Sequence, residues 1–189
     1  MPATETIRQM LAPGRPFDPG RVWEVVELIE GQPRKLAHLI KCLFDENPAI
    51  ASRAADALER VTRDRPHQAQ RWKEPLLGLL AETTEKKVRW NLAVTIPRLK
   101  LTILECRRIA VVLNTWSSDR SSIVKTAALH AMADLTRQDP DSLPAVLDIL
   151  RVAGRSGTPA MRARSRILLK AFECQKQKHQ NRSSVHMFD

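Results

Sequence analysis

The sequence predicts an all-α protein, an α-solenoid of about four helical hairpins preceded by an N-terminal capping helix. A twelve-residue pattern recurs four times at intervals of 36 to 38 residues, starting at Ile50, Val88, Val124 and Met161. Its first, fifth, ninth and twelfth places are mostly apolar and fall on one stripe of a helix that turns about 100° per residue. In addition, a leucine stands eleven residues before each start, at Leu39, Leu77, Leu113 and Leu150. Each repeat is therefore expected to contain two amphipathic helices.

Stacking follows from the size of the repeat. A hairpin of this length cannot bury both of its apolar faces alone, so it must pack on its neighbours and share one continuous core with them. The composition agrees, because aromatic residues make up only 4%, Tyr is absent and Gly totals 6. These values are typical of helices packed through Ala and Leu, and they disfavour a β-rich fold. We expect one repeat domain over residues 21–175.

The first element expected after the N-terminus is the capping helix. Residues 1–20 are interrupted by Pro and Gly and are predicted to be a flexible leader, with room for one short helix over 4–11. The capping helix begins after Gly20 and is closed by Gly31 and Pro33. Its apolar residues lie on more than one side, which suits a terminal helix that covers the first full repeat.

The four repeats follow in order, and helix-start signals agree with their register. They span about 33–70, 71–106, 107–141 and 142–175, and the basic, polar tail 176–189 is predicted to be disordered. Asn47 precedes Pro48 and Thr158 precedes Pro159, the order expected where a helix begins. Pro97 falls inside the second helix of the second repeat, so a kink or an early end is expected near 93–96.

The pattern resembles HEAT repeats, whose second helix commonly carries a basic residue in the second place. VRWNLAVTI, VKTAALHAM and MRARSRILL have it as Arg89, Lys125 and Arg162, whereas the first repeat has Ala51. The resemblance covers residues 33 to about 175, and the chain is also similar to small prokaryotic HEAT-repeat proteins. It implies a right-handed solenoid and a scaffold or adaptor function, and it implies that the second-place base bonds an acidic residue of a loop.

The geometry of the family also implies which residues line the inner, concave surface. These are the third, seventh and tenth places of the pattern, which include Trp90 and Val94. An apolar, aromatic centre on a face expected to be wet indicates a partner site for a peptide, helix or protein. Arg53 and Arg98 are expected to flank it, with His130 one repeat on. The alternative is that the kink at Pro97 turns Trp90 into packing against a neighbouring helix.

Charge supports a second interpretation. The net charge is +10, and nine basic residues stand against one acidic residue between Arg151 and Arg182. A positive charge concentrated at the C-terminal end of the chain attracts anionic partners. The alternative function is therefore nucleic-acid binding through the last repeat and tail, with Arg162, Arg164, Arg166 and Lys170 as the contacting residues.

Catalysis, metal binding and a membrane span find little support. The five His residues do not pair at helical spacing, and no phosphate-binding loop or nucleophile motif is present. We therefore expect no catalytic residue, no metal site and no cofactor. Cys42, Cys106 and Cys174 are odd in number and widely spaced, so buried free thiols are expected. No apolar run has the length of a signal peptide or a membrane span, which predicts a cytoplasmic protein.

Overall fold

The computed structural model describes residues 5–14 and 20–185, with side chains up to Gln177. The described residues form α-helices joined by turns and short 3₁₀ segments, and they contain no β-strand. The chain divides into two compact units, Met1–Thr102 and Ile103–Asp189. The sequence predicts one repeat domain over 21–175, so this division at residue 102 is a difference, and each unit is described by itself.

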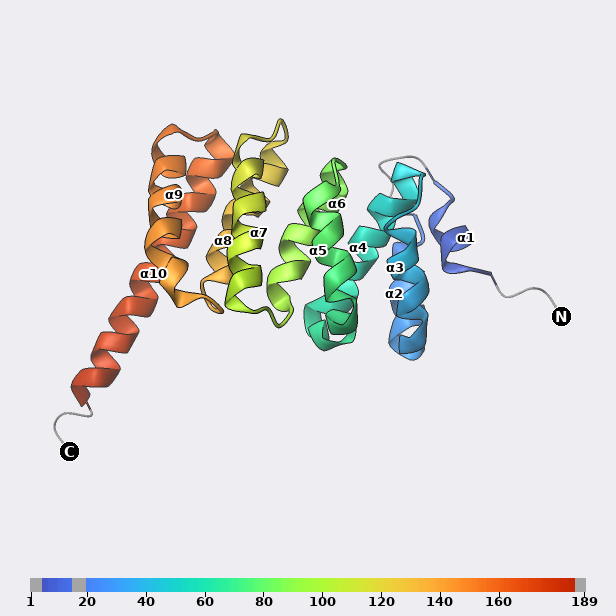
Figure 1. Cartoon of the computed structure of the whole chain (residues 1–189), viewed down its shortest axis with the longest axis horizontal. Coiled ribbons are helices and arrows are strands. Elements are labelled where there is room, and N and C mark those ends of the chain that lie inside the picture. The colour runs from blue at the N-terminus through green and yellow to red at the C-terminus, as the bar shows by residue number, and fades with distance from the viewer. Residues whose placement is uncertain (1–4, 15–19, 186–189) are drawn as a thin grey trace. The chain divides into compact units, whose positions relative to one another are not determined.

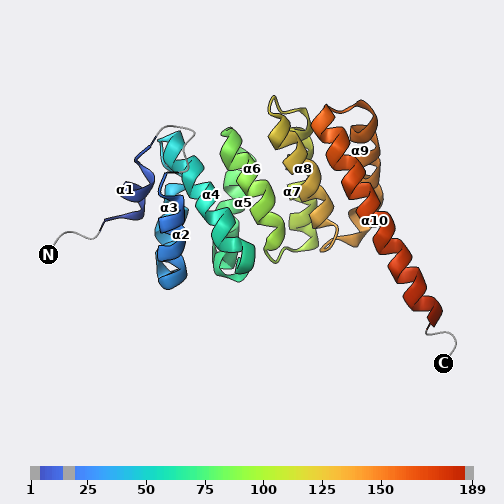
Figure 2. The same cartoon turned by 180° about the vertical axis from the view of Figure 1, so that it is seen from behind.

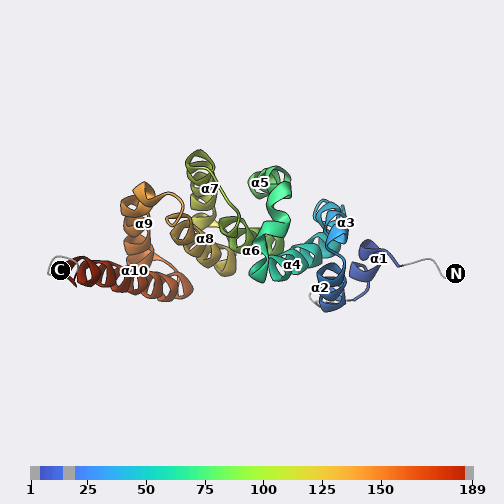
Figure 3. The same ribbon diagram turned by 90° about the horizontal axis from the view of Figure 1, so that it is seen from below.

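The first unit is built from two layers of helices. Its helices are α1 (Ile7–Leu11), α2 (Val22–Gly31), α3 (Leu36–Cys42), α4 (Pro48–Asp64), α5 (Lys73–Glu82) and α6 (Lys86–Thr95). Within the unit, α3 and α5 lie on one side, and α2, α4 and α6 lie on the other (Figures 1 and 3). Helix α4 is central, since it contacts α2, α3 and α6.

Helix α4 forms where the sequence predicts it. The side chain of Asn47 accepts a hydrogen bond from the backbone N–H of Ala49 at 3.0 Å, and Pro48 occupies the first helical position. The four pattern positions of α4 are all buried, and they are Ile50, Ala54, Leu58 and Val61. Cap, proline and apolar stripe thus fix one register for this helix.

Helix α6 ends early, as predicted from Pro97. The α-helix stops at Thr95 and continues as a 3₁₀ turn over Ile96–Arg98. Proline lacks the N–H that a further helical turn needs, and its ring crowds the turn before it. The chain then leaves the helix at Leu99, which is still buried.

Within the predicted leader, residues 7–11 form the short helix for which the sequence leaves room over 4–11. Thr6 and Gln9 bond reciprocally as a capping box at the start of α1, and the helix buries Ile7, Met10 and Leu11. A helix of five residues is too short to be stable alone. It is held by tertiary contacts, among them the ion pair of Arg8 with Asp45 at 2.6 Å. Residues 1–4 and 15–19, which complete the predicted leader, lie outside the described residues.

The second unit also has two layers. Its helices are α7 (Ile103–Thr115), α8 (Ser122–Leu135), α9 (Leu143–Ser156) and α10 (Pro159–Val185). Helices α7 and α9 lie on one side, and α8 and α10 lie on the other (Figures 2 and 3). Helix α10 contacts both α8 and α9.

The turn between α9 and α10 requires glycine. A Cβ atom on Gly157 would lie 2.4 Å from the carbonyl oxygen of Ala153 and 2.9 Å from the Cβ of Met161, which is closer than real contacts allow. Thr158 then caps α10, because its hydroxyl accepts a hydrogen bond from the N–H of Met161 at 3.3 Å. The predicted cap at Thr158 is confirmed.

Helix α10 is longer than predicted. It runs to Val185, so the region 176–185, expected to be disordered, is helical, and residues 186–189 lie outside the described part of the chain. Of the three cysteines expected to be buried, Cys42 and Cys106 are buried and Cys174 on α10 is exposed. The register of the repeats puts Cys174 just past the last position of the buried stripe.

The repeated stripe is confirmed in the first three repeats and in part of the fourth. All twelve stripe positions that start at Ile50, Val88 and Val124 are buried. In α10, Met161 and Ser165 are buried, whereas Leu169 and Phe172 are half-buried. Leu39, Leu113 and Leu150 are completely buried, but Leu77 is only half-buried. On α5 the buried leucines are instead its neighbours Leu76 and Leu80.

None of the described helices is both long enough and apolar enough to cross a bilayer.

Candidate functional site

The exposed side of α6 carries the predicted anchor. Trp90 has 43% of its surface exposed. It lies on the opposite side of the helix from the buried residues Val88 and Leu92, and Val94 follows one turn later and is half-buried. Trp90 is therefore not enclosed in the core of the unit, although more than half of its surface is covered by neighbouring residues.

Helix α4 presents a row of paired charges beside α6. Arg60 and Asp56 form an ion pair at 3.0 Å, and Arg63 pairs with Glu59 at 2.8 Å. Arg98, from the turn after α6, reaches back to α4 and pairs with Glu59 at 2.6 Å. The same guanidinium donates to the carbonyl oxygen of Glu59 at 2.8 Å. These bonds fix the side chains before any partner arrives.

Burial and the two arginines act in opposite directions on Glu59. Burial of this side chain raises the pKa of the carboxyl, whereas the hydrogen bonds from Arg98 and Arg63 lower it, and the net result is a pKa below the usual value of Glu. Glu59 is therefore ionised at neutral pH. Its charge holds the turn after α6 against α4.

A second exposed tryptophan lies on α2. Trp23 has 54% of its surface exposed, and the guanidinium of Arg60 lies 4.1 Å from the centre of its ring. This is a cation–π contact. Since α4 contacts both α2 and α6, the paired charges of α4 lie between the two tryptophan-bearing helices. We call this surface the α2–α4–α6 face, with the residues Trp23, Asp56, Glu59, Arg60, Arg63, Trp90, Val94 and Arg98.

Trp23 was not among the predicted site residues. One signal could have found it: Arg60 and Arg98 occupy the same place of the pattern, the eleventh. Both turn back toward the preceding helix of their layer, Arg98 to Glu59 and Arg60 to Trp23. The shared place of the two arginines thus indicates a recurring contact.

Arg53 is not a flanking residue of the face. Only 3% of it is exposed, and its guanidinium donates to the carbonyl oxygens of Leu11 at 2.7 Å and Ala12 at 3.2 Å. The prediction is wrong because Arg53 turns sideways, toward the end of α1, rather than outward. Its role in the structure is to hold α1 on α4.

His130 belongs to the second unit, on α8. Its Nε2 lies 3.4 Å from Asp134, and its Nδ1 lies 3.4 Å from the guanidinium of Arg164 on α10. Arg164 is half-buried by this packing. Of the four predicted anion-binding residues, it is therefore the least available.

The other predicted bases lie exposed along α10. Arg162, Arg166 and Lys170 follow one another at intervals of four residues on one side of the helix. One nitrogen of Arg162 donates to the carbonyl oxygen of Gly157 at 3.0 Å. Arg89, in the same place of the pattern, donates to the carbonyl of Thr83 at 2.7 Å. In both of these bonds the acceptor is a backbone carbonyl of the turn that precedes the helix.

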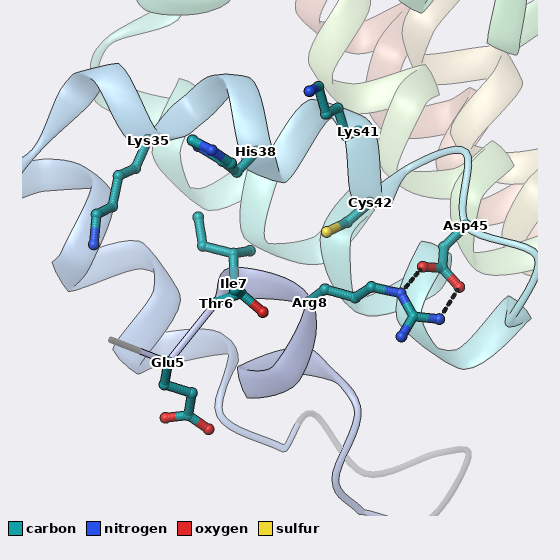
Figure 4. Close-up of a pocket in the computed structure, with 9 residues that line it drawn as sticks. All are labelled: Glu5, Thr6, Ile7, Arg8, Lys35, His38, Lys41, Cys42 and Asp45. Carbon is teal, nitrogen blue, oxygen red and sulfur yellow. Dashed lines mark hydrogen bonds and ion pairs between the residues drawn. The ribbon is translucent and has the colours of Figure 1, made fainter. Parts of the chain in front are cut away.

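A cavity of about 390 Å³ lies between α1 and α3 (Figure 4). Ile7, His38 and Cys42 are grouped around its centre, Lys35 stands at one end and the Arg8–Asp45 pair at the other. Burial raises the pKa of the Cys42 thiol, so it stays protonated and forms an apolar wall. The hydrogen bond from Arg8 lowers the pKa of Asp45, which stays ionised and paired. No sequence pattern indicated this cavity, because it depends on the packing of α1.

Among the side chains that the structure describes, no three His, Cys, Asp or Glu residues lie close enough together to hold a metal ion. Comparison with family models, curated proteins and solved structures finds no match to this chain.

Proposed function

We propose that the protein is a HEAT-like helical repeat protein that works as a non-catalytic interaction module. Its first unit would bind a peptide, a helix or another protein on the α2–α4–α6 face. The observation that carries this proposal is the exposure of Trp23 and Trp90 on the two helices beside the paired charges of α4. Exposed Trp and Arg residues are enriched among the residues that dominate binding energy in protein interfaces.

Two further observations support the proposal. The arginines of the face are already held by Asp56, Glu59 or Trp23, so little side-chain freedom remains to be lost on binding. The stripe of the twelve-residue pattern is buried throughout the first three repeats and in part of the fourth, which agrees with stacked HEAT-like hairpins of a right-handed solenoid. A surface of rigid helices is well suited to bind a partner without catalysing a reaction.

Replacing Trp90 with alanine tests the proposal. We expect at least a thirtyfold loss of affinity for a partner captured from the native organism, since a central tryptophan contributes about 2 kcal/mol or more. The melting temperature is expected to fall less than for a fully buried residue, because 43% of the Trp90 surface is exposed. Phe44→Ala is the matched control: this aromatic residue is exposed in the same unit but outside the face. Retained binding in Trp90→Ala, or equal loss in Phe44→Ala, contradicts the proposal.

Nucleic-acid binding is the second candidate function, and one observation favours it. Arg162, Arg166 and Lys170 are exposed on one side of α10, and none of them forms an ion pair with a described side chain. Positions eight residues apart on a helix are about 12 Å apart along its axis, which suits contacts to successive phosphates.

The salt dependence of DNA binding distinguishes the two functions. Three phosphate contacts predict that affinity for duplex DNA falls about fortyfold between 50 and 200 mM salt. Lys170→Gln is expected to weaken binding at low salt and to reduce the slope of log K against log salt by about 1. Lys86→Gln, an exposed lysine of the first unit, serves as the control. Absence of binding at 50 mM salt would exclude this function.

A further inference from the structure

We propose that the cavity between α1 and α3 binds a small organic anion with an apolar body, such as an aromatic carboxylate or sulfonate. This inference does not rest on the proposed function, since the cavity shares no residue with the α2–α4–α6 face. Its volume of about 390 Å³ falls within the range of small-molecule sites.

The apolar body is specified by the centre of the cavity. Ile7 and Cys42 are buried and line it from α1 and α3, and the His38 ring stands beside them (Figure 4). The aliphatic stems of Arg8 and Lys35 extend this wall at the two ends. Such a lining excludes a strongly hydrated ion as the sole occupant and favours a flat or compact hydrocarbon group.

The expected sign of the ligand's charge follows from how the charged side chains that line the cavity are paired. Both carboxylates of the lining are paired: Asp45 with Arg8 at 2.6 Å, and Glu5 with Arg21 at 2.7 Å, a guanidinium that also pairs with Glu24. The side-chain ammonium groups of Lys35 and Lys41 form no ion pair or hydrogen bond with a described residue. Their charges are therefore uncompensated, and they favour an anionic head group.

The head group is placed at the Lys35 end. Lys35 ends the short turn before α3 and His38 follows one turn later on α3, and both face the cavity in Figure 4. The amine of Lys41 points away from Ile7 and Cys42, so its positive charge attracts the head group from a distance and does not contact it. At the opposite end, the Arg8 guanidinium is engaged by Asp45 through two nitrogens, at 2.6 and 3.2 Å.

The dye 8-anilinonaphthalene-1-sulfonate is a suitable probe, because it joins an aromatic body to one sulfonate and fluoresces when it leaves water. We expect saturable binding of one dye molecule per chain. Lys35→Glu is expected to weaken this binding at least about fivefold, since an attraction becomes a repulsion at a partly exposed site. Lys86→Glu changes the net charge equally on another helix and is expected to leave the affinity unchanged.

A second pair of variants separates this cavity from other surfaces. Cys42→Trp is expected to fill the cavity and abolish binding, while Trp90→Ala is expected to leave dye affinity unchanged. If Cys42→Trp fails to fold, Lys35→Glu still decides, because Lys35 lies at the surface. Absence of dye binding to the folded wild type, or affinity that depends on Trp90 and not on Lys35, would overturn the inference.

Discussion

Replacing Leu76 with alanine lowers the free energy of unfolding by about 3 kcal/mol, within the range for a leucine removed from a packed core. Leu76 is completely buried on α5, the helix that precedes and contacts α6. The truncation removes apolar contacts and leaves a hollow that the neighbouring helices close only in part. Urea unfolding followed by circular dichroism measures the change.

Leu77→Ala is the matched control, since it makes the same chemical change at the adjacent position. Leu77 is only half-buried, so we expect a loss of about 1 kcal/mol. If Leu77→Ala costs more than Leu76→Ala, the face of α5 that packs into the unit is the one predicted from the spacing of the leucines, and the observed register is wrong.

Replacing Arg98 with alanine lowers the free energy of unfolding by about 2 kcal/mol. The change removes the ion pair to the Glu59 carboxylate at 2.6 Å and the bond to the Glu59 carbonyl at 2.8 Å. It leaves a mostly buried carboxylate with less compensation, which costs more than the loss of a surface pair. Arg63→Ala is the control, because Arg63 bonds the same carboxylate from an exposed position, and its loss is expected to cost under about 1 kcal/mol.

The effect of Arg98→Ala depends on pH in a defined direction. The folded-state pKa of Glu59 lies below its usual value, so the stabilisation is complete above the unfolded pKa of about 4.3 and is lost as pH falls through the lower, folded value. The difference between wild type and Arg98→Ala is therefore larger at pH 7 than at pH 3. A difference that stays constant or grows on acidification contradicts the assigned role of the pair.

Much of the helical organisation was predictable because it depends on local chemistry. The cap at Asn47, the turn at Pro97 and the buried stripe of α4 each follow from interactions within one helix or with its core side. The prediction that Leu77 is buried fails because the number of residues between the last buried leucine and the start of the pattern differs between repeats. The last buried leucine of α5, Leu80, lies eight residues before Val88, whereas Leu150 lies eleven before Met161, so a fixed spacing selects the wrong neighbour.

The candidate sites were only partly predictable. Periodicity identifies the side of a helix that lies away from its buried stripe, and on α6 this side carries the exposed Trp90 and the half-buried Val94. It does not identify lateral contacts between helices, and these decide the roles of Arg53 and Trp23. Helix α1 is too short to leave a periodic signal, so the cavity it forms with α3 could not be predicted.

The hold of Arg53 on the end of α1 has a practical consequence for truncation. A shortened chain that begins at Gly20 would deprive this interior guanidinium of the oxygens of Leu11 and Ala12. It would also strip apolar cover from α3 and α4, the helices that α1 contacts. Expression trimmed at the proline-rich boundary would therefore yield a weakened first unit, and affinity tags are better fused at the carboxyl end.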